Sequence, residues 1–549
     1  MDMKKSVCIL ALAVLSLHAG AQGVNSTVQV TNDYQSRVAD VNKQTMDMLV
    51  PDSLLHFDYK FDYSVFESPY KGAYEFTPYS ILVSPKSEAR AAHKLYLRGG
   101  AGYTLHPVLD FVWAPVSNDK CAVSIYNTGR GFIGTFSALE TPLRDVAGDF
   151  KGLDISDILG AEARWALGKA EVKADVNYGF IGTGAEMDLN GFGSEGNPFI
   201  THSIKGGVGA GSIGEAPIAW SARLAGSYLL SGDMSDSKEY YGTLSGFVGM
   251  GRGAGRIKLD YLAGYYSFTQ PAPPEYDTES FPIVSLTPHY DFVYRGFNIS
   301  AGVKLDYTDH FSIVPDARIS IGVADDAINI YAGVGGGQSI CDYFSLRQNF
   351  HAAGEICPGI SQEALHIFLG MDGHYGSPLR YALRFGLRNF KDAAVETMYG
   401  YTTAAFTRAY GNINLSWVDE RVDADANIVV SSIVKNGGNI DMIGDSACSG
   451  NMHFTYNWNK RIYAGFFGEG RTAREGNLPP FDENPGAGPV AGTFKVPGWF
   501  NLGVRGEYRP TFKLGVWVEA ANLLGMDMWI NPAYAQTGRI FTAGISLNL

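Results

Sequence analysis

The chain has 549 residues, of which 66 are glycine and only 18% are charged. Tyrosine and phenylalanine number 31 each, and this composition is typical of one large β structure with tight turns and aromatic girdles. The formal net charge of -13 argues against a nucleic-acid partner, because phosphates call for a basic surface. No spacing of cysteine and histidine indicates a zinc site, and no pattern calls for a cofactor.

The first 21 residues are predicted to be a secretory signal peptide. Two lysines, Lys4 and Lys5, precede an apolar run from Val7 to Leu17, and the Ala-Gly-Ala sequence at residues 19–21 fits the small-x-small rule for cleavage. The apolar run is too short to anchor the chain, and no later stretch reaches the roughly 20 apolar residues of a spanning helix. If the mature protein crosses a membrane, it therefore does so as a β-barrel.

Residues 22–53 are polar and show little periodicity, which predicts a periplasmic tail. From residue 54 to residue 549, short segments of alternating polar and apolar residues follow one another, separated by turn residues. Alternation with a period of two is the pattern of a β-strand whose faces meet different environments. The sequence holds about 22 such segments, from Leu55–Val65 to Thr537–Leu549, and predicts an all-β protein that forms a transmembrane antiparallel β-barrel. In a closed barrel, the first and last of these segments would pair.

Charged residues on one face of these segments predict a water-filled interior. In Lys169–Phe180, the polar face carries charges of both signs, while Val172 and Val176 lie on the other face. A strand of a soluble sandwich also alternates, but five polar residues of both signs suit a lumen better. Opposite charges along such a wall can pair across neighbouring strands. The predicted lumen-facing residues are Lys169, Glu171, Lys173, Asp175, Arg256, Lys258, Asp260, Lys304 and Asp306.

The connections between segments alternate between short and long. Outer-membrane barrels have short turns in the periplasm and longer loops outside. With the C-terminus in the periplasm, the short turns at Gly168 and Arg295 fall inside, and long connections such as Gly335–Glu363 and Arg471–Gly498 fall outside. The stretch His106–Lys120 falls on the periplasmic side although it is not short.

Four cysteines remain after cleavage, and Cys341 and Cys357 share one predicted loop. In an oxidising compartment these two either form a disulfide or stay as two thiols, and the sequence favours neither. The indoles of Trp499 and Trp529 suit the interfacial girdle of a barrel, with stacking on a ligand at the outer mouth as the alternative.

No catalytic constellation emerges from the sequence, so we expect no enzyme activity. The stretch 445–450 contains serine and cysteine but lacks the glycine elbow and the paired base that activate a nucleophile. His351, Glu355 and His366 match no metal-ligand spacing, and we interpret them as scattered polar loop residues.

The end of the chain carries its most specific pattern. Residues 518–525 read Val-Glu-Ala-Ala-Asn-Leu-Leu-Gly, and residues 538–541 read Gly-Arg-Ile-Phe. These stretches resemble the C-terminal barrel of TonB-dependent receptors, particularly those of the Bacteroidota. The family's penultimate strand ends in Val-x-x-x-Asn-Leu-Phe/Leu, and its closing signature is Gly-Arg-x-Phe. The resemblance implies a barrel in the outer membrane of a Gram-negative bacterium, in contact with outer-membrane lipid.

Members of that family also carry an N-terminal plug domain and a segment that engages TonB. Residues 22–53 are too few for an independently folded plug, and no TonB-binding segment is recognisable in them. The resemblance therefore implies that a separate plug, a lipoprotein or another complex subunit acts as partner, and leaves coupling to TonB open.

The sequence supports two hypotheses about function. In the first, the protein is a solute transport pore or receptor, gated by loops such as Gly335–Glu363 or by a partner subunit, because a wide barrel left open would compromise the membrane. In the alternative, it is a barrel that transports nothing and serves as the scaffold of a surface or membrane-assembly complex through its long loops.

Overall fold

The structure is a computed structural model. It describes residues 94–549 except for residues 104, 119, 140–147, 186–198, 214–216, 233–236, 253–254, 273–274, 324–326, 352, 354–355, 357, 377, 399, 437–441 and 482–489. The predicted signal peptide, the tail 22–53 and the strand candidate Leu55–Val65 lie outside the described residues. The same holds for Cys357, so its disulfide with Cys341 stays a prediction.

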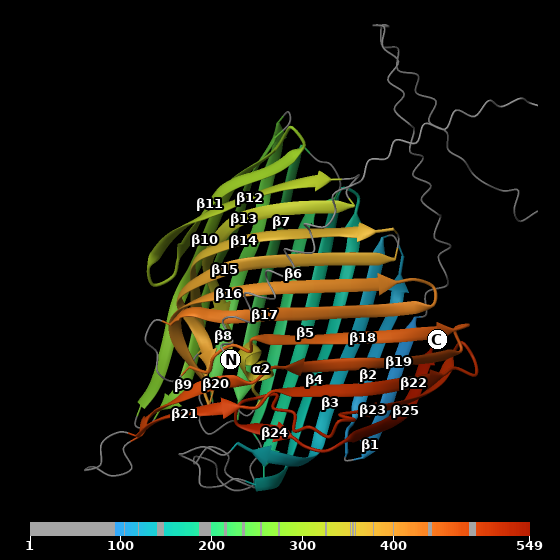
Figure 1. The fold of residues 1–549 in the computed structure, drawn as a ribbon. Helices are drawn as coiled ribbons and strands as arrows, with labels where there is room; N and C mark the ends of the chain where they lie inside the picture. Colours follow the sequence, from blue (N-terminus) through green and yellow to red (C-terminus); the bar gives the residue numbers. More distant parts are fainter. Residues whose placement is uncertain are drawn as a thin grey trace, which may run out of the picture. The chain divides into compact units, whose positions relative to one another are not determined.

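In the described part of the chain, 22 strands pair side by side into one closed antiparallel β-barrel, as the alternating pattern predicted (Figure 1). The first eleven are β1 (Leu95–Tyr103), β2 (Val108–Ser117), β3 (Cys121–Ala138), β4 (Gly148–Leu167), β5 (Ala170–Ala185), β6 (Phe199–Ser212), β7 (Ile218–Ser231), β8 (Lys238–Arg252), β9 (Gly255–Ala272), β10 (Glu275–Tyr294) and β11 (Phe297–Tyr307). The other eleven are β12 (Phe311–Val323), β13 (Ile328–Cys341), β14 (Gly359–Tyr375), β15 (Leu379–Glu396), β16 (Tyr401–Val418), β17 (Val422–Asn436), β18 (Cys448–Trp458), β19 (Ile462–Arg471), β22 (Trp499–Tyr508), β23 (Leu514–Ala521) and β25 (Ile540–Asn548).

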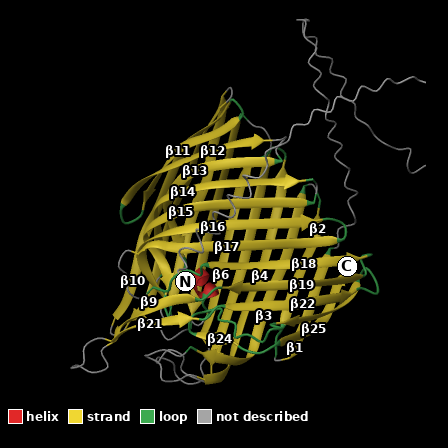
Figure 2. Ribbon diagram, in the orientation of Figure 1, coloured by secondary structure: helices red, strands yellow, loops and turns green. Residues whose placement is uncertain are grey.

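Three further strands and one helix belong to the connections. β20 (Arg474–Phe481) and β21 (Val490–Val496) form a separate two-stranded sheet, and β24 (Tyr534–Gln536) pairs with the end of β3. The helix is α2 (Tyr343–Asn349), between β13 and β14 (Figure 2). Among the described residues, no helix has the length and hydrophobicity needed to cross a bilayer.

The barrel closes where β25 meets β1. These strands pair from Tyr96 opposite Asn548 to Tyr103 opposite Phe541, while the other edge of β25 pairs with β23. Closure leaves no unpaired strand edge in the wall. The closing partner of the last strand is therefore Leu95–Tyr103, and the pairing considered for Leu55–Val65 is wrong. The wall begins at Leu95, so the stretch before it is longer than residues 22–53, which alone are too few for a plug.

The predicted connection His106–Lys120 is also wrong, because it contains the strand β2. β2 pairs with β1 on one side and with β3 on the other. The sequence of β2 does not alternate, because apolar residues fall on both of its faces and Pro115 follows them. These apolar residues are Leu109, Phe111, Val112 and Trp113. The pairing with β3 shifts register between Trp113 and Val116. The connection that remains, residues 118–120, is as short as the other turns at that end.

The long connections lie at one end of the barrel, as predicted, but that end also has short connections, such as residues 308–310 between β11 and β12. We call the end with the turns at Gly168 and Arg295-Gly296 the turn rim, and the end with α2 and β20 the loop rim. Both residues of the β10–β11 turn have positive φ, 50° at Arg295 and 83° at Gly296, as a two-residue hairpin turn that matches strand twist requires.

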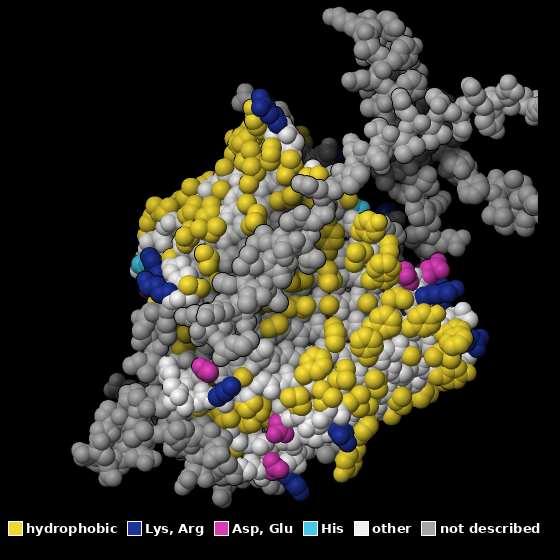
Figure 3. All heavy atoms as spheres, viewed as in Figure 1, with side chains coloured by type: hydrophobic (Ala, Val, Ile, Leu, Met, Phe, Trp, Pro, Cys, Tyr) yellow, Lys and Arg dark blue, Asp and Glu magenta, His cyan; other side chains and the backbone are white. Residues whose placement is uncertain are grey.

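Apolar side chains alternate along each strand and cover the outward face of the wall. Ile257 and Leu259 of β9 are 58% and 40% exposed, and Val516 and Val518 of β23 are 49% and 56% exposed. Figure 3 shows hydrophobic side chains gathered over this surface, with most charged ones at its edges. A continuous apolar face of this size suits hydrocarbon rather than water.

Candidate functional site

The connection between β13 and β14 turns into the barrel instead of extending from its rim. Its described part from Asp342 to His351, which includes α2, is called the inner segment below. It contacts Lys205 of β6 and Glu239 of β8, and its Phe350 ring lies 6.4 Å from that of Tyr401 in β16. Strands β6 and β16 lie on nearly opposite sides of the ring, so the inner segment crosses the interior.

Asp342 begins α2 and ties it to the wall. Its side chain accepts a hydrogen bond from the backbone N–H of Ser345 at 2.8 Å, which caps the helix. Both of its carboxylate oxygens also lie 3.0 Å from the Nζ of Lys205, which donates to them. One carboxylate therefore serves the helix start and an ion pair to β6.

Glu239 holds the first turn of α2 from the other side. Its side chain is fully buried, and its Oε2 accepts hydrogen bonds of 2.7 Å from the backbone N–H of Tyr343 and from the hydroxyl of Tyr266. A buried carboxyl group is costly without donors, and these two donors lower that cost. The hydroxyl of Tyr343 in turn donates to the hydroxyl of Ser231 in β7 at 3.3 Å.

Apolar packing completes the attachment of the inner segment. Phe344 lies over Gly179 of β5, where an added Cβ would be only 2.3 Å from its Cζ. The rings of Tyr343 and Phe268 stack at 5.8 Å, and Phe350 is fully buried. These side chains join one hydrophobic cluster with Phe136 of β3 and other residues of the wall. The glycine is thus required for close approach of the segment to the wall.

His351 ends the inner segment at an ion-pair distance from β4. Its Nδ1 lies 2.5 Å from the Oδ1 of Asp154. A cavity of about 230 Å³ lies beside this pair and is lined by polar groups of three elements, including Ser156 of β4, Gln348 of α2 and Asn531 of the β23–β25 connection. The inner segment therefore leaves a polar hollow where it meets the wall.

At the loop rim, the long connections pack against one another. Met398, Ile443, Phe494 and Met528 come from four different connections and are all buried in one cluster. Trp499 and Trp529 belong to it too, are 7% and 6% exposed, and are joined by a hydrogen bond of 2.8 Å from the indole N–H of Trp499 to the carbonyl oxygen of Trp529. Both interpretations of these tryptophans, as girdle or as stacking platform, are therefore wrong, because tertiary packing buries them.

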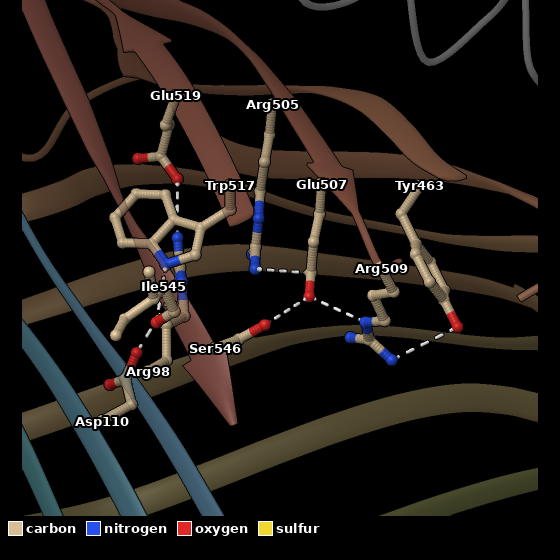
Figure 4. Close-up of polar contacts among 10 residues, drawn as sticks. All are labelled: Arg98, Asp110, Tyr463, Arg505, Glu507, Arg509, Trp517, Glu519, Ile545 and Ser546. Atoms are coloured by element: carbon tan, nitrogen blue, oxygen red, sulfur yellow. Dashed lines mark hydrogen bonds and ion pairs between the residues drawn. The ribbon is translucent and has the colours of Figure 1, made fainter. Parts of the chain in front are cut away.

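A polar network lies across the seam that closes the barrel (Figure 4). Arg98 of β1 lies with its guanidinium carbon 4.0 Å from the ring centre of Trp517, and donates to Glu519 at 3.2 Å. It also lies 3.6 Å from Asp110 of β2. Trp517 is 1% exposed, and its indole N–H donates to the carbonyl oxygen of Ile545. Arg98 thus links both strands next to the seam.

The second half of this network is centred on Glu507 of β22, whose carboxylate is 5% exposed. It accepts a hydrogen bond of 2.6 Å from Ser546 of β25 and one of 2.7 Å from Arg509, and Arg505 lies 3.9 Å away. Arg509 also lies over the ring of Tyr463 at 4.2 Å. A buried acid surrounded by donors keeps the seam polar without unpaired charge.

The predicted lumen-facing residues of β5 form ion pairs. Glu171 pairs with Arg164 and with Lys173, the latter at 2.9 Å, and Asp175 pairs with Arg223 of β7 at 2.7 Å. Arg223 reaches past β6 over Gly207, where an added Cβ would lie 2.6 Å from its Nη2. Lys169 lies in the turn before β5 and is exposed. Asn177 lies on the same face of β5 as these residues and is directly opposite Lys205 of β6, which binds Asp342. The predicted lumen-facing residues of β5 therefore share the face that holds the inner segment.

The remaining predicted residues lie on the same face. Lys258 and Asp260 pair at 2.9 Å and alternate along β9 with Tyr266, which contacts Glu239. Lys304 and Asp306 pair at 3.5 Å, and Asp306 accepts a hydrogen bond from the backbone N–H of Gln338 at 2.8 Å. Arg256 is exposed near the turn rim.

The sequence did not single out Lys205, Glu239 or Arg98, although each occupies a polar position in an alternating segment. The histidines considered as metal ligands lie apart: His351 contacts Asp154, and His366 contacts the hydroxyl of Tyr410 at 2.7 Å. Glu355 lies outside the described residues. Within the described part of the chain, no three acidic, histidine or cysteine side chains are arranged to hold a metal ion.

A closed 22-strand antiparallel barrel with an apolar outer face and a polar inner face has the fold of solved outer-membrane receptor barrels. The solved structures similar to it are receptors rather than enzymes.

Three of them are a mutant of the ferric enterobactin receptor PfeA of Pseudomonas aeruginosa, the siderophore receptor PirA of Acinetobacter baumannii, and the pyoverdine outer-membrane receptor FpvA of Pseudomonas aeruginosa. The identities are 9%, 11% and 9%, and the TM-scores are 0.59, 0.59 and 0.60. Each match covers 83% of this chain and 79–80% of the other. No family model and no curated protein matches the sequence.

Proposed function

We propose that the protein is an outer-membrane transport protein whose solute pathway runs through the barrel and is closed by the inner segment. The observation that carries the proposal is the attachment of that segment across the interior, with Asp342 bound to Lys205 and Tyr343 bound to Glu239. Both contacts are polar, so water can replace them when the inner segment leaves the wall. The segment can therefore have an attached and a released state, as a gate requires.

The charged inner face supports a pathway for a polar solute. Its ion pairs lie along the wall, as Asp175 with Arg223 and Lys258 with Asp260 do, so charges of both signs line the pathway that the inner segment closes. The loop rim would face the outside, and the turn rim, with Leu549, the periplasm after cleavage of the signal peptide. The similar solved structures are receptors for siderophores, and this supports a receptor role at the outer surface.

The test compares conductance in planar bilayers of the full-length protein with that of a variant in which residues 343–351 are replaced by a Gly-Ser linker of equal length. We expect small or absent conductance for the natural protein and large, steady conductance for the variant. Ile257→Ala, on the lipid-facing side of β9, is the control and should behave like the natural protein. Heat-dependent gel mobility establishes that each variant is folded.

Equal conductance of the natural protein and the linker variant would overturn the gate. If both are silent and a second protein co-purifies in fixed ratio from native membranes, the proposal fails in favour of the scaffold function. If the linker variant conducts and a co-purified protein blocks that conductance, the co-purified protein acts as a plug, and transport is supported.

A further inference from the structure

Two aromatic rings on the inner face lie over glycines of each other's strands. Tyr331 of β13 lies over Gly370 of β14, where an added Cβ would be 2.3 Å from its Cζ. Phe368 of β14 lies over Gly333 of β13, where the corresponding distance is 2.5 Å. The rings meet edge to face at 6.2 Å. The missing Cβ atoms let both rings lie close against the backbone of the neighbouring strand.

Two arginines use these rings as supports. The guanidinium carbon of Arg318 in β12 lies 4.4 Å from the ring centre of Tyr331. That of Arg384 in β15 lies 5.5 Å from the same ring and 5.2 Å from Phe368, and its Nε donates to the hydroxyl of Tyr331 at 3.3 Å. Stacking fixes the planes of both guanidinium groups but leaves most of their N–H donors free for a ligand.

These arginines have no ion-pair partner among the described residues. Within the described residues, no carboxylate lies within ion-pair distance of Arg318, Arg384 or Arg256, whereas five other arginines of the inner face are paired. Those paired arginines are Arg98, Arg223, Arg388, Arg408 and Arg509, with carboxylates at 2.5–3.2 Å. Two like charges that share one aromatic ring repel each other, and an anion between or beside them removes that cost.

A hollow of about 500 Å³ adjoins Arg318 near the turn rim. Arg256 and Arg318 both line it, together with the hydroxyls of Ser300 and Ser320 and the amide of Asn298. Its one carboxylate, Asp291, already accepts a hydrogen bond of 2.6 Å from Ser300. The lining therefore carries two unpaired positive charges and one negative charge, in a protein whose net charge is -13.

We propose that this hollow, here called the arginine site, binds the carboxylate or phosphate groups of a small anion through Arg256 and Arg318, with Arg384 as a positioning residue behind Tyr331. Planar guanidinium groups bind such oxyanions in a bidentate manner, and serine and asparagine supply further donors. This inference adds the class of solute to the proposed function. Only the claim that the anion passes through the barrel rests on that function; binding of the anion does not. Binding is therefore measured apart from conductance.

The experiment titrates citrate, and separately inorganic phosphate, into the purified full-length protein in neutral detergent at low ionic strength, with calorimetric detection. We expect saturable binding of citrate by the natural protein that weakens as salt is raised. Arg318→Ala should weaken it about tenfold to a hundredfold, since it removes a charged hydrogen-bonding partner. Arg384→Ala removes the hydrogen bond to the Tyr331 hydroxyl and a cation against its ring, but no proposed ligand contact, and should weaken citrate binding by a factor of about two to five.

Arg223→Gln is the matched control, because it removes one positive charge from the same face at a site already paired with Asp175. It should leave citrate affinity unchanged. Arg318→Lys keeps the charge but loses the planar fork, and should bind citrate more weakly than the natural protein. All variants are compared at equal heat-dependent gel mobility, so that loss of folding is not scored as loss of binding.

No binding by the natural protein, or equal loss in Arg223→Gln and Arg318→Ala, would overturn the arginine site. If citrate binds through Arg318 while the linker variant of the inner segment conducts no better than the natural protein, the site stands and the gate fails. If that variant conducts while Arg318→Ala binds citrate as well as the natural protein does, transport stands and the anion class fails. A synthetic peptide of residues 54–86 that displaces citrate would assign the site to the protein's own chain, contradicting the proposal of a small free anion.

Discussion

The indole of Trp517 lies against the backbone of Gly100, where an added Cβ would be 2.4 Å from its Cζ2. The two residues belong to β23 and β1, the strands on either side of β25 at the closing seam. The guanidinium carbon of Arg98, two residues before Gly100, lies 4.0 Å from the centre of the same ring. The seam is therefore closed by side-chain packing on its inner face as well as by backbone hydrogen bonds.

We expect Gly100→Ala to impair closure of the barrel. The new methyl group would meet both the indole of Trp517 and the carbonyl oxygen of Ala543, the latter at 2.7 Å, and the backbone cannot move aside without breaking the β1–β25 pairing. Overpacking of this kind costs about 1–3 kcal/mol. The free energy of unfolding in urea, followed by gel mobility, measures it. Gly99→Ala is the control, because no atom lies within 4 Å of its added Cβ, and an equal loss in both variants would contradict the argument.

Arg98→Ala should destabilise the barrel by about 1–3 kcal/mol, because it removes a cation–π contact and a charged hydrogen bond at a side chain that is only 10% exposed. Lys173→Ala breaks a pair whose lysine is 62% exposed, and should cost under about 1 kcal/mol. Urea unfolding of both variants under one condition gives the comparison. A larger loss for Lys173→Ala would show that the seam network is not a principal contributor to stability.

Gly179→Ala should loosen the inner segment. Its methyl group would collide with Phe344, and the ring must leave its place against β5. We expect more frequent opening events in planar bilayers, with the barrel itself intact. Gly242→Ala in β8 adds the same group where nothing lies within 4 Å, and its recordings should match those of the natural protein.

Asp342→Ala should release the inner segment more than Lys205→Ala does. The aspartate variant loses the cap on Ser345 as well as the ion pair, and loss of the cap alone costs about 0.5–2 kcal/mol. Arg347 is fully buried in the closed arrangement, so the rate of trypsin cleavage after Arg347 reports opening. Asp342→Asn keeps a capping oxygen and should fall between the natural protein and Asp342→Ala.

The turn between β16 and β17 should weaken in acid. Backbone N–H groups of Arg421 and Val422 donate to Asp419, and these hydrogen bonds, helped by the indole of Trp417, hold the pKa of its carboxyl below the usual value. Because the pKa of Asp419 is lower in the folded protein, its carboxylate stabilises the turn at every pH above the ordinary aspartate pKa. This stabilisation is lost as the pH falls through the lowered pKa of the folded state. Hydrogen exchange of the Arg421 and Val422 amides should lose protection there, and Asp419→Ala should lack protection at every pH. Equal protection in both proteins at neutral pH would refute the role of the carboxylate.

The amino-acid sequence by itself determined the class of structure, since alternation is a local property of each strand and does not depend on its partner. It marked the short turns, the face that carries Glu171 and Asp260, and a strand total that agrees with the structure. The totals agree because the alternating stretch Leu55–Val65 counts as one strand that is not in the wall, while β2 does not alternate and is not counted. A strand with apolar residues on both faces, such as β2, has no period to detect.

Only the tertiary structure decided what closes and fills the barrel. Arg98 and Glu519 are separated by 421 positions in the sequence, and Glu239 and Tyr343 by 104. The residues next to each of them in the sequence do not indicate which partner it binds. The inward course of Asp342–His351 likewise depends on the space at Gly179, which belongs to the distant strand β5. Local pattern specifies which side of a strand is polar, whereas the pairing of polar groups depends on the order of strands around the ring and on which side chains leave room.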